Sequence, residues 1–198
     1  MLATNGQGGR YWTTVDPTYV APEDYGAVGD GVTDDTTAIQ AALDYGRTNN
    51  VAVRGYKKYK TTSSLTISGS YQDVFIRIIT YTGNSCGLYI KGSYNNVRIA
   101  QLYCSNGGGI VMNADTANIH RNRVSAVRIF AKNDAVKLQA DGNYMVVYNS
   151  FDIRDIKSDT ANCYLCTAYN ASENVFMNSS CVSLDRKSGS AGMPRPIS

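Results

Sequence analysis

The sequence lacks any long apolar run, although 43% of its 198 residues are hydrophobic. No stretch approaches the roughly 20 apolar residues that a membrane-spanning helix requires, so we expect no membrane insertion. Residues 1–9 lack the basic and apolar regions of a secretion signal, which predicts folding in a cytoplasm. The net charge of +3 is too small to favour nucleic-acid binding.

Histidine is scarce, and this scarcity restricts the catalytic chemistry that the chain can perform. His120 is the single histidine in the sequence, and no Gly-x-Ser-x-Gly segment accompanies it. A serine or cysteine triad would therefore have one candidate base for every role. By strand alternation we expect His120 to be a surface residue rather than a general base.

Cysteine usage argues against both a disulfide framework and a metal site. The chain has five cysteines, an odd number. Cys163-Tyr-Leu-Cys166 has CxxC spacing, but no second CxxC is present, and a zinc site usually needs four well-spaced ligands. We expect buried thiols that act as small hydrophobic residues, with no metal and no cofactor.

The abundant residues are those of β-structure and turns. Tyrosine occurs 15 times and glycine 18 times, a balance that favours an all-β protein with many polar turns. One helix is expected, over residues 33–46. Thr33 would cap its N-terminus, Asp34 and Asp35 would lie in its first turn, and Gly46 would adopt the left-handed conformation at its end.

After residue 50 the sequence repeats a short β-branched run followed by a turn of Gly, Asn, Asp or Ser. The runs start at positions 74, 97, 119, 145 and 175. Their period of roughly 20–30 residues, without intervening helices, indicates a solenoid of short strands. We therefore predict a parallel β-helix of about five coils.

The segment that introduces these coils resembles a known motif. It reads Asp24-Tyr-Gly-Ala-Val-Gly-Asp-Gly-Val-Thr-Asp-Asp35 and continues through Thr36-Thr-Ala-Ile-Gln-Ala-Ala-Leu-Asp44. It resembles the entry motif of the pectin-lyase-like β-helix family, which includes phage tailspikes and polysaccharide lyases and hydrolases. The resemblance implies a right-handed parallel β-helix, with the helix covering its N-terminal end. We read the aspartates as turn and cap residues, with a cation site as the alternative.

Three segments follow from this assignment. Residues 1–20 are expected to be a leader or virion-attachment linker, residues 21–185 a short β-helix domain, and residues 186–198 a polar tail. By resemblance to tailspikes, we expect a homotrimer in the tail of a virion, folded in the host cytoplasm. Its partners would be bacterial surface polysaccharide and other tail proteins.

Glycan hydrolysis requires two carboxylates, and adjacent coils can bring two together. Asp134 and Asp155 are separated by close to one coil of sequence and are the best candidate pair. Turn or surface aspartates are the alternative interpretation. For glycan binding, aromatic faces and cations predict Tyr103, Tyr148, Arg128 and Arg154, with tyrosine stacking beside the solenoid as the alternative.

The shortness of the β-helix decides between the functional hypotheses. Enzymatic tailspikes of this kind have much longer β-helices, so we favour a virion component for host glycan attachment or tail assembly, without catalysis. The alternative is a depolymerase, a glycoside hydrolase or polysaccharide lyase that acts on capsule or lipopolysaccharide. A third hypothesis, a bacterial cell-surface β-helix protein, is disfavoured by the absent secretion signal.

Overall fold

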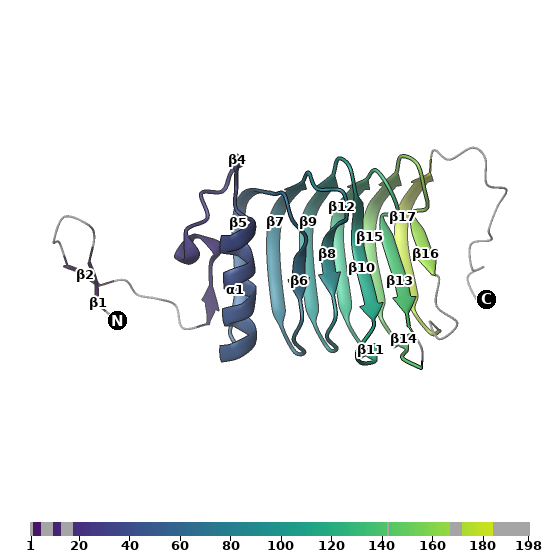
Figure 1. The fold of residues 1–198 in the computed structure, drawn as a ribbon, viewed down its shortest axis with the longest axis horizontal. Coiled ribbons are helices and arrows are strands. Elements are labelled where there is room, and N and C mark those ends of the chain that lie inside the picture. The colour runs from purple at the N-terminus through teal and green to yellow at the C-terminus, as the bar shows by residue number, and fades with distance from the viewer. Residues whose placement is uncertain (1, 5–9, 13–17, 142, 167–171, 184–198) are drawn as a thin grey trace.

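The computed structural model is a right-handed parallel β-helix of about five coils, with one α-helix at its N-terminal end (Figure 1). The structure describes residues 2–4, 10–12, 18–141, 143–166 and 172–183. The predicted fold class is confirmed. The predicted tail, residues 186–198, lies outside the described residues.

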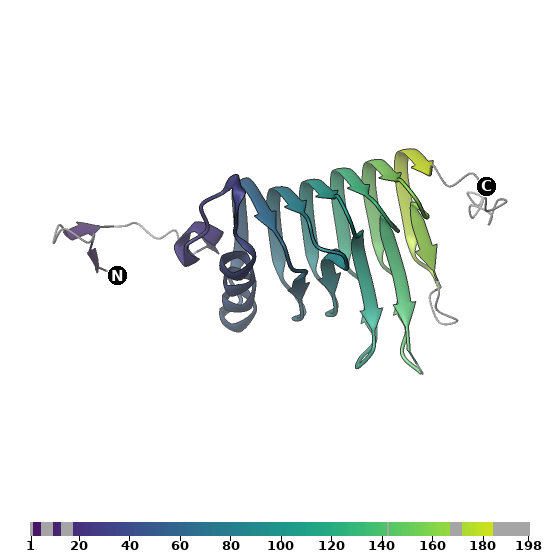
Figure 2. The ribbon, with the colours of Figure 1, turned by 45° about the horizontal axis from the view of Figure 1, so that its top comes forward.

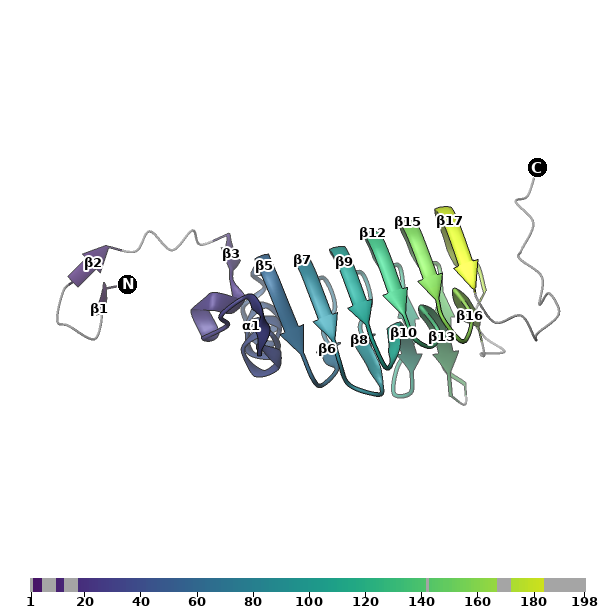
Figure 3. The same ribbon diagram turned by 90° about the horizontal axis from the view of Figure 1, so that it is seen from above.

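Each coil contributes one strand to a long sheet and one to a short sheet, and the strands of each sheet lie side by side and parallel (Figure 3). Two coils add a strand to a third, two-stranded sheet, β11 (Ile119–His120) with β14 (Val146–Val147). The short sheet contains β6 (Leu65–Ile67), β8 (Cys86–Ile90), β10 (Gly108–Ala114), β13 (Val136–Ala140) and β16 (Tyr164–Cys166). The long sheet contains β5 (Ala52–Thr61), β7 (Asp73–Tyr81), β9 (Asn96–Cys104), β12 (Arg123–Ala131), β15 (Ser150–Ser158) and β17 (Val175–Ser183).

The register of the long sheet fixes the length of each coil. One inward column runs through all six strands and consists of Val53, Val74, Val97, Val124, Phe151 and Phe176. The predicted register was wrong in two coils, because the runs at residues 119 and 145 belong to the small third sheet. The long strands of those coils start at residues 123 and 150. In the sequence, the apolar residues of a two-residue strand that faces the core look the same as the first residues of a long strand, which explains the wrong register.

The core is built from such columns, since residues in register on successive coils stack at about 4.8 Å. Strand alternation directs side chains inward in each half of a long strand, and two consecutive residues in the middle face outward, as the burial patterns of β9 and β12 show. Near the C-terminal end of the described coils, the column ends in stacked rings of Phe151 and Phe176, 4.9 Å apart. The interior is therefore continuous through all the coils.

Buried amides follow the core at the turns that lead into the long strands. The carboxamide oxygens of Asn95, Asn122, Asn149 and Asn174 each accept a hydrogen bond from the backbone N–H one coil earlier, at 2.8–3.0 Å. Their amide groups donate to turn carbonyls, such as Asn122 to Gly92 at 3.0 Å. This asparagine ladder satisfies backbone groups that the turns would otherwise leave buried without partners.

Helix α1 (Thr36–Asn49) lies across the first coil and buries Ile39, Ala42 and Leu43 against it (Figures 1 and 2). It begins three residues later than predicted. At its edge, the Gln40 side-chain amide accepts from Thr66 N–H at 2.8 Å and donates to Thr66 C=O at 3.0 Å. The Gln40 amide thus makes the pair of hydrogen bonds that a neighbouring strand would make, and it covers the first edge of the short sheet.

The two predicted ends of α1 were wrong in detail. Thr33 lies in β4 (Asp30–Asp34), and Asp35 occupies the N-cap position. Gly46 is inside the helix, where a Cβ would meet Val53 Cγ2 at 2.7 Å. Asn50 instead takes the left-handed conformation, at φ 52°. Close packing between helix and sheet, rather than a turn, explains the glycine.

The segment before α1 closes the end of the long sheet. It contains β3 (Tyr19–Val20) and a 3-10 helix (Pro22–Tyr25), and both β3 and β4 pair with β5. Asp30 accepts hydrogen bonds from Val32 and Thr33, both at 2.7 Å, which confirms a turn role. Further towards the N-terminus, β1 (Leu2–Thr4) and β2 (Arg10–Trp12) form an antiparallel pair.

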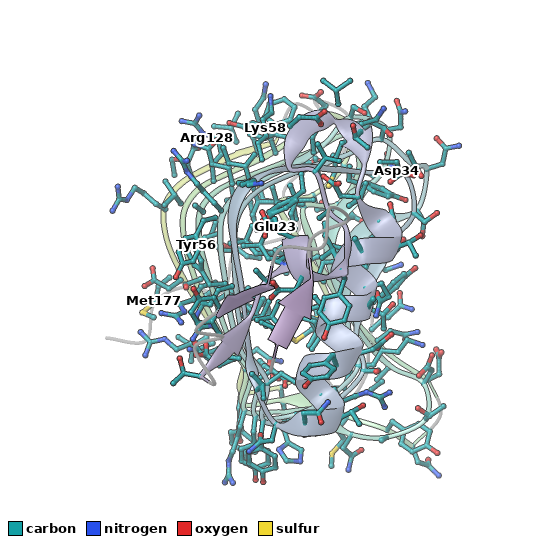
Figure 4. The ribbon with its side chains drawn as sticks, turned by 90° about the vertical axis from the view of Figure 1, so that its left-hand side faces the viewer. Glu23, Asp34, Tyr56, Lys58, Arg128 and Met177 are labelled. Atoms are coloured by element: carbon teal, nitrogen blue, oxygen red, sulfur yellow. The ribbon has the colours of Figure 1, made fainter. Side chains whose placement is uncertain are left out.

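Viewed from its N-terminal end, the solenoid shows α1 in front and Glu23 over the centre of the first coil (Figure 4). Glu23 accepts a hydrogen bond from Tyr59 at 2.8 Å, and burial together with this bond raises the pKa of Tyr59. No helix in the described part of the chain is long and apolar enough to cross a membrane.

Candidate functional site

The outer face of the long sheet carries a shallow groove of about 290 Å³. The groove lies where the nine-residue strands bend, between an outward column that includes Ser125 and a corner column that includes Val127. We call it the long-sheet groove; it is lined by Phe75, Arg98, Ile99, Ala100, Ser125, Ala126, Val127, Asp152 and Arg154. Three strands and part of a fourth thus form one surface that follows the solenoid axis.

At its N-terminal end the groove has an aromatic and cationic border. Arg98 lies over the ring of Phe75, with its Cζ 6.0 Å from the centroid, and Phe75 contacts Tyr56 at 5.4 Å between ring centroids. Asp73 forms ion pairs with both Arg54 and Arg98. Partial burial alone would raise the pKa of Asp73, but the two arginines outweigh it and hold the pKa below its usual value. These ring contacts and ion pairs hold the side chains of this border in place.

At the other end the groove is open and charged. Asp152 and Arg154 both lie on β15, on either side of Ile153, and both are exposed. Among the ion pairs of the described residues, none involves either side chain. In Figure 4, Tyr56 of β5 and Met177 of β17 project from the same side of the solenoid and mark the two ends of this face. The groove therefore offers a guanidinium and a carboxylate without ion-pair partners to a ligand.

Beside the groove, a polar column crosses the long sheet. Gln101, Arg128, Asp155 and Ser180 are in register on four consecutive strands. Arg128 Nε donates to Asp155 at 2.9 Å, and Ser180 Oγ donates to the other carboxylate oxygen at 2.9 Å. Ser180 and Arg128 both lower the pKa of Asp155. An ionised Asp155 could act as a base or nucleophile, but it is poorly suited to donate a proton.

Asp134 lies on a different face. It belongs to the turn between β12 and β13 and accepts from the backbone N–H of Asn162 at 3.1 Å. It borders a hollow of about 210 Å³ on the short sheet, which we call the short-sheet hollow and which also contains Tyr89 and Lys137. Gly108 also lines this hollow, and a Cβ there would approach the Asp134 carbonyl to 3.0 Å.

The structure does not bring Asp134 and Asp155 together in register. The residue that stacks on Asp155 from the preceding coil is Arg128, because this coil is longer than the spacing between the two aspartates. The catalytic role assigned to the pair stays a prediction.

The predicted glycan-binding residues are distributed over three places. Arg154 lines the groove and Arg128 belongs to the polar column. Tyr103 lies on β9 beside that column, and its hydroxyl donates to Gln101 at 3.1 Å. Tyr148 lies apart from them, in a turn before β15. Sequence reasoning missed Phe75 and Arg98 as members of one surface with Arg154. Only the correct coil register, which aligns residues 75, 98, 125 and 152, reveals this.

Three of the four cysteine side chains that the structure describes are buried. Cys86, Cys104 and Cys163 are buried and Cys166 is exposed; the side chain of Cys181 lies outside the described residues. Burial raises the pKa of Cys86 to about 11 and that of Cys104 to about 12, which disfavours the reactive thiolate. No group of three potential metal ligands occurs among the described His, Cys, Asp and Glu residues.

Comparison with known proteins gives one partial likeness. No family model matches the chain. A segment of 43 residues, 22% of the chain, is 44% identical to a protein described as "Depolymerase, capsule K30/K69-specific" of Klebsiella phage K64-1. The matched segment spans 6% of the length of that relative. The likeness and the β-helix together support a tailspike-type phage protein.

Proposed function

We propose that this chain is a tailspike-type component of a phage virion that attaches to bacterial surface polysaccharide through the long-sheet groove. One observation carries the proposal: a parallel β-helix with a segment similar to a phage capsule depolymerase also has an open, axis-parallel groove with unpaired charges. A shallow groove suits an extended polymer better than a compact small molecule, which would favour an enclosed pocket.

The chemistry of the groove is appropriate for sugars. Phe75 provides an apolar ring surface, Arg154 provides planar hydrogen-bond donors, and Asp152 can accept from hydroxyl groups. Glycan hydroxyl and carboxylate groups match these donors and acceptors. All three residues lie on strands, Phe75 on β7 and the other two on β15.

Binding of the purified chain to a panel of capsular polysaccharides and lipopolysaccharides tests the proposal. We expect one or more to bind, and Arg154→Gln to weaken that binding by about tenfold, because a bidentate charged contact is lost. Arg77→Gln is the matched control. Arg77 is also exposed and holds the same corner position on β7, but it does not line the groove. Equal effects of both substitutions, or no binding by the wild type, would contradict the proposal.

Depolymerase activity is the second candidate, because the relative is described as a depolymerase. The test is release of reducing ends, or of unsaturated sugars, from a bound polysaccharide. We expect activity, if observed, to depend on Asp134, Asp155 or Asp152, and to fall by about 100-fold or more in the corresponding Asn variant. Binding without product release in the wild type would identify an attachment protein.

A further inference from the structure

The turns before the long strands contain a second, unusual series of residues. In five consecutive coils the residue just before the buried Gln72 or the asparagine ladder has a positive φ, between 56° and 61°. We call this series the corner ladder; its members are Tyr71, Tyr94, Arg121, Tyr148 and Glu173. Glycine and asparagine adopt this conformation most easily, and bulky residues rarely do. Large side chains at five such positions point to a role for the side chains themselves.

The side chains follow one another along the solenoid, and those from Tyr71 to Arg121 are in direct contact. The rings of Tyr71 and Tyr94 are stacked, with centroids 4.8 Å apart and planes within 7°. Arg121 donates a hydrogen bond to the Tyr94 hydroxyl at 3.0 Å, and its Cζ lies 5.7 Å from the centre of that ring. His120 meets the Tyr94 ring edge-on at 5.0 Å. Tyr148 is the next rung, and the neighbouring Glu173 raises the pKa of its hydroxyl.

The corner ladder is open to solvent and carries a charge without an ion-pair partner. Tyr71 is 68% exposed and Tyr148 is 54% exposed, so both present ring surface outward. No ion pair between described residues includes Arg121. Two accessible aromatic surfaces thus flank one guanidinium. From Tyr71 to Tyr148 there are three coil steps, about 14 Å at ~4.8 Å per coil, which is enough for a short oligosaccharide.

We propose that the corner ladder binds an acidic polysaccharide, with sugar rings against Tyr71 and Tyr148 and a sugar carboxylate on Arg121. Tyrosine combines a flat apolar face with a hydroxyl, which suits sugar rings, and arginine binds carboxylates through paired N–H donors. The inference rests on the proposed function for the class of ligand. It adds a site separate from the long-sheet groove, because none of the ladder residues lines that groove.

Saturation-transfer NMR with the full chain tests the inference. The probes are alginate oligosaccharides, which consist of uronates, the polysaccharide bound by the wild type, and neutral dextran oligosaccharides of matched length. We expect binding of the uronate probe and little binding of dextran. Arg121→Gln should weaken uronate binding about tenfold or more, and Arg77→Gln, also an exposed arginine, should leave it unchanged.

The tyrosines can be tested without adding backbone strain. Tyr71→Asn and Tyr148→Asn remove the rings but place asparagine in a conformation that it tolerates, so thermal stability should not fall. Both should lose affinity for the uronate probe by about tenfold, whereas Tyr148→Phe should stay within about threefold.

The outcomes separate this inference from the proposed function. If ladder variants melt at lower temperature but bind both the uronate probe and the surface polysaccharide normally, the ladder is purely structural and the inference is wrong. If surface polysaccharide binds and only Arg154→Gln lowers the affinity, the proposed function is supported and the ladder site is contradicted. Loss of binding in Arg121→Gln but not in Arg154→Gln supports the ladder site and contradicts binding in the long-sheet groove. A wild type that binds no polysaccharide overturns both.

Discussion

Asp35 shows how one buried side chain can organise the entry to the solenoid. It is 2% exposed, and its two carboxylate oxygens accept the backbone N–H groups of Val28 and Gly29 at 2.7 and 3.1 Å. It also stands at the N-cap of α1, and its own N–H donates to the Lys60 carbonyl at 2.9 Å. One residue therefore connects the preceding loop, the helix and β5.

We expect Asp35→Ala to lower the free energy of unfolding by about 3 kcal/mol, because two N–H groups lose charged acceptors. Urea unfolding followed by circular dichroism measures this loss. Asp44→Ala is the control on the same helix, since Asp44 accepts one side-chain hydrogen bond from Gln40 at 3.2 Å. A similar loss in both variants would mean that the loop contacts of Asp35 contribute little.

Asp155 gives a prediction about pH. Its pKa is lowered in the folded protein by Ser180 and Arg128, so ionised Asp155 stabilises the fold at neutral pH. That contribution is lost as the pH falls from the ordinary carboxyl pKa of 3.8 through the lowered value. Because the side chain is 39% exposed, solvent screening keeps the effect below about 1 kcal/mol.

The measurement compares the wild type with Asp155→Asn in urea at pH 7 and at about pH 2. The variant should be slightly less stable at pH 7 and equal at the acid pH. The difference at pH 7 should also shrink in high salt, as expected for an exposed ion pair. A difference that persists unchanged at the acid pH would show that the carboxylate charge is not its cause.

At the scale of elements, α1 was predictable as an element, but its ends were not. The alternation of Ile39, Ala42 and Leu43 with polar residues identifies the buried face from the sequence. Gly46 looked like a helix end because glycine is common there. A glycine is needed at this position because a Cβ would meet Val51 and Val53. That contact depends on how closely the helix lies on β5, which local sequence does not encode.

We expect Gly46→Ala to destabilise the protein by about 2 kcal/mol, although alanine is the better helix former, because the new Cβ would lie 2.8 Å from the Val51 carbonyl oxygen. Asn50→Gly is the control, since Asn50 has φ 52° and glycine accepts that conformation. It should change stability by less than about 0.5 kcal/mol. Thermal and urea unfolding measure both; a neutral or stabilising Gly46→Ala would contradict the close packing.

The coils and the carboxylate pair show where prediction from sequence stopped. The repetition of about five coils is visible because inward positions are apolar in every coil. The coils, however, differ in length, since Val53 is in register with Val74 but Val97 with Val124. A fixed spacing therefore aligns the wrong residues. Asp134 and Asp155 matched the shortest coil but lie in a longer one, and the outward residues of the groove could not be aligned without the register.

For the whole molecule, we propose a homotrimer, which is supported by exposed apolar side chains on β17 outside the groove lining, namely Val175, Met177 and Val182. Multi-angle light scattering should give three times the chain mass of 21.5 kDa. Met177→Lys should weaken assembly, because a charge would enter the apolar contact. Met145→Lys is the control, since Met145 is also exposed but lies before β14. A wild-type mass of 21.5 kDa would refute the trimer.

The stacking of coils has a consequence for how the protein is made. Each long strand after β5 pairs with the long strand that was synthesised one coil earlier, and α1 precedes all the coils. A strand leaving the ribosome therefore finds its template already present, beginning with the covered first coil. The solenoid can grow in the direction of translation, so that a newly made coil exposes one sheet edge only until the next arrives.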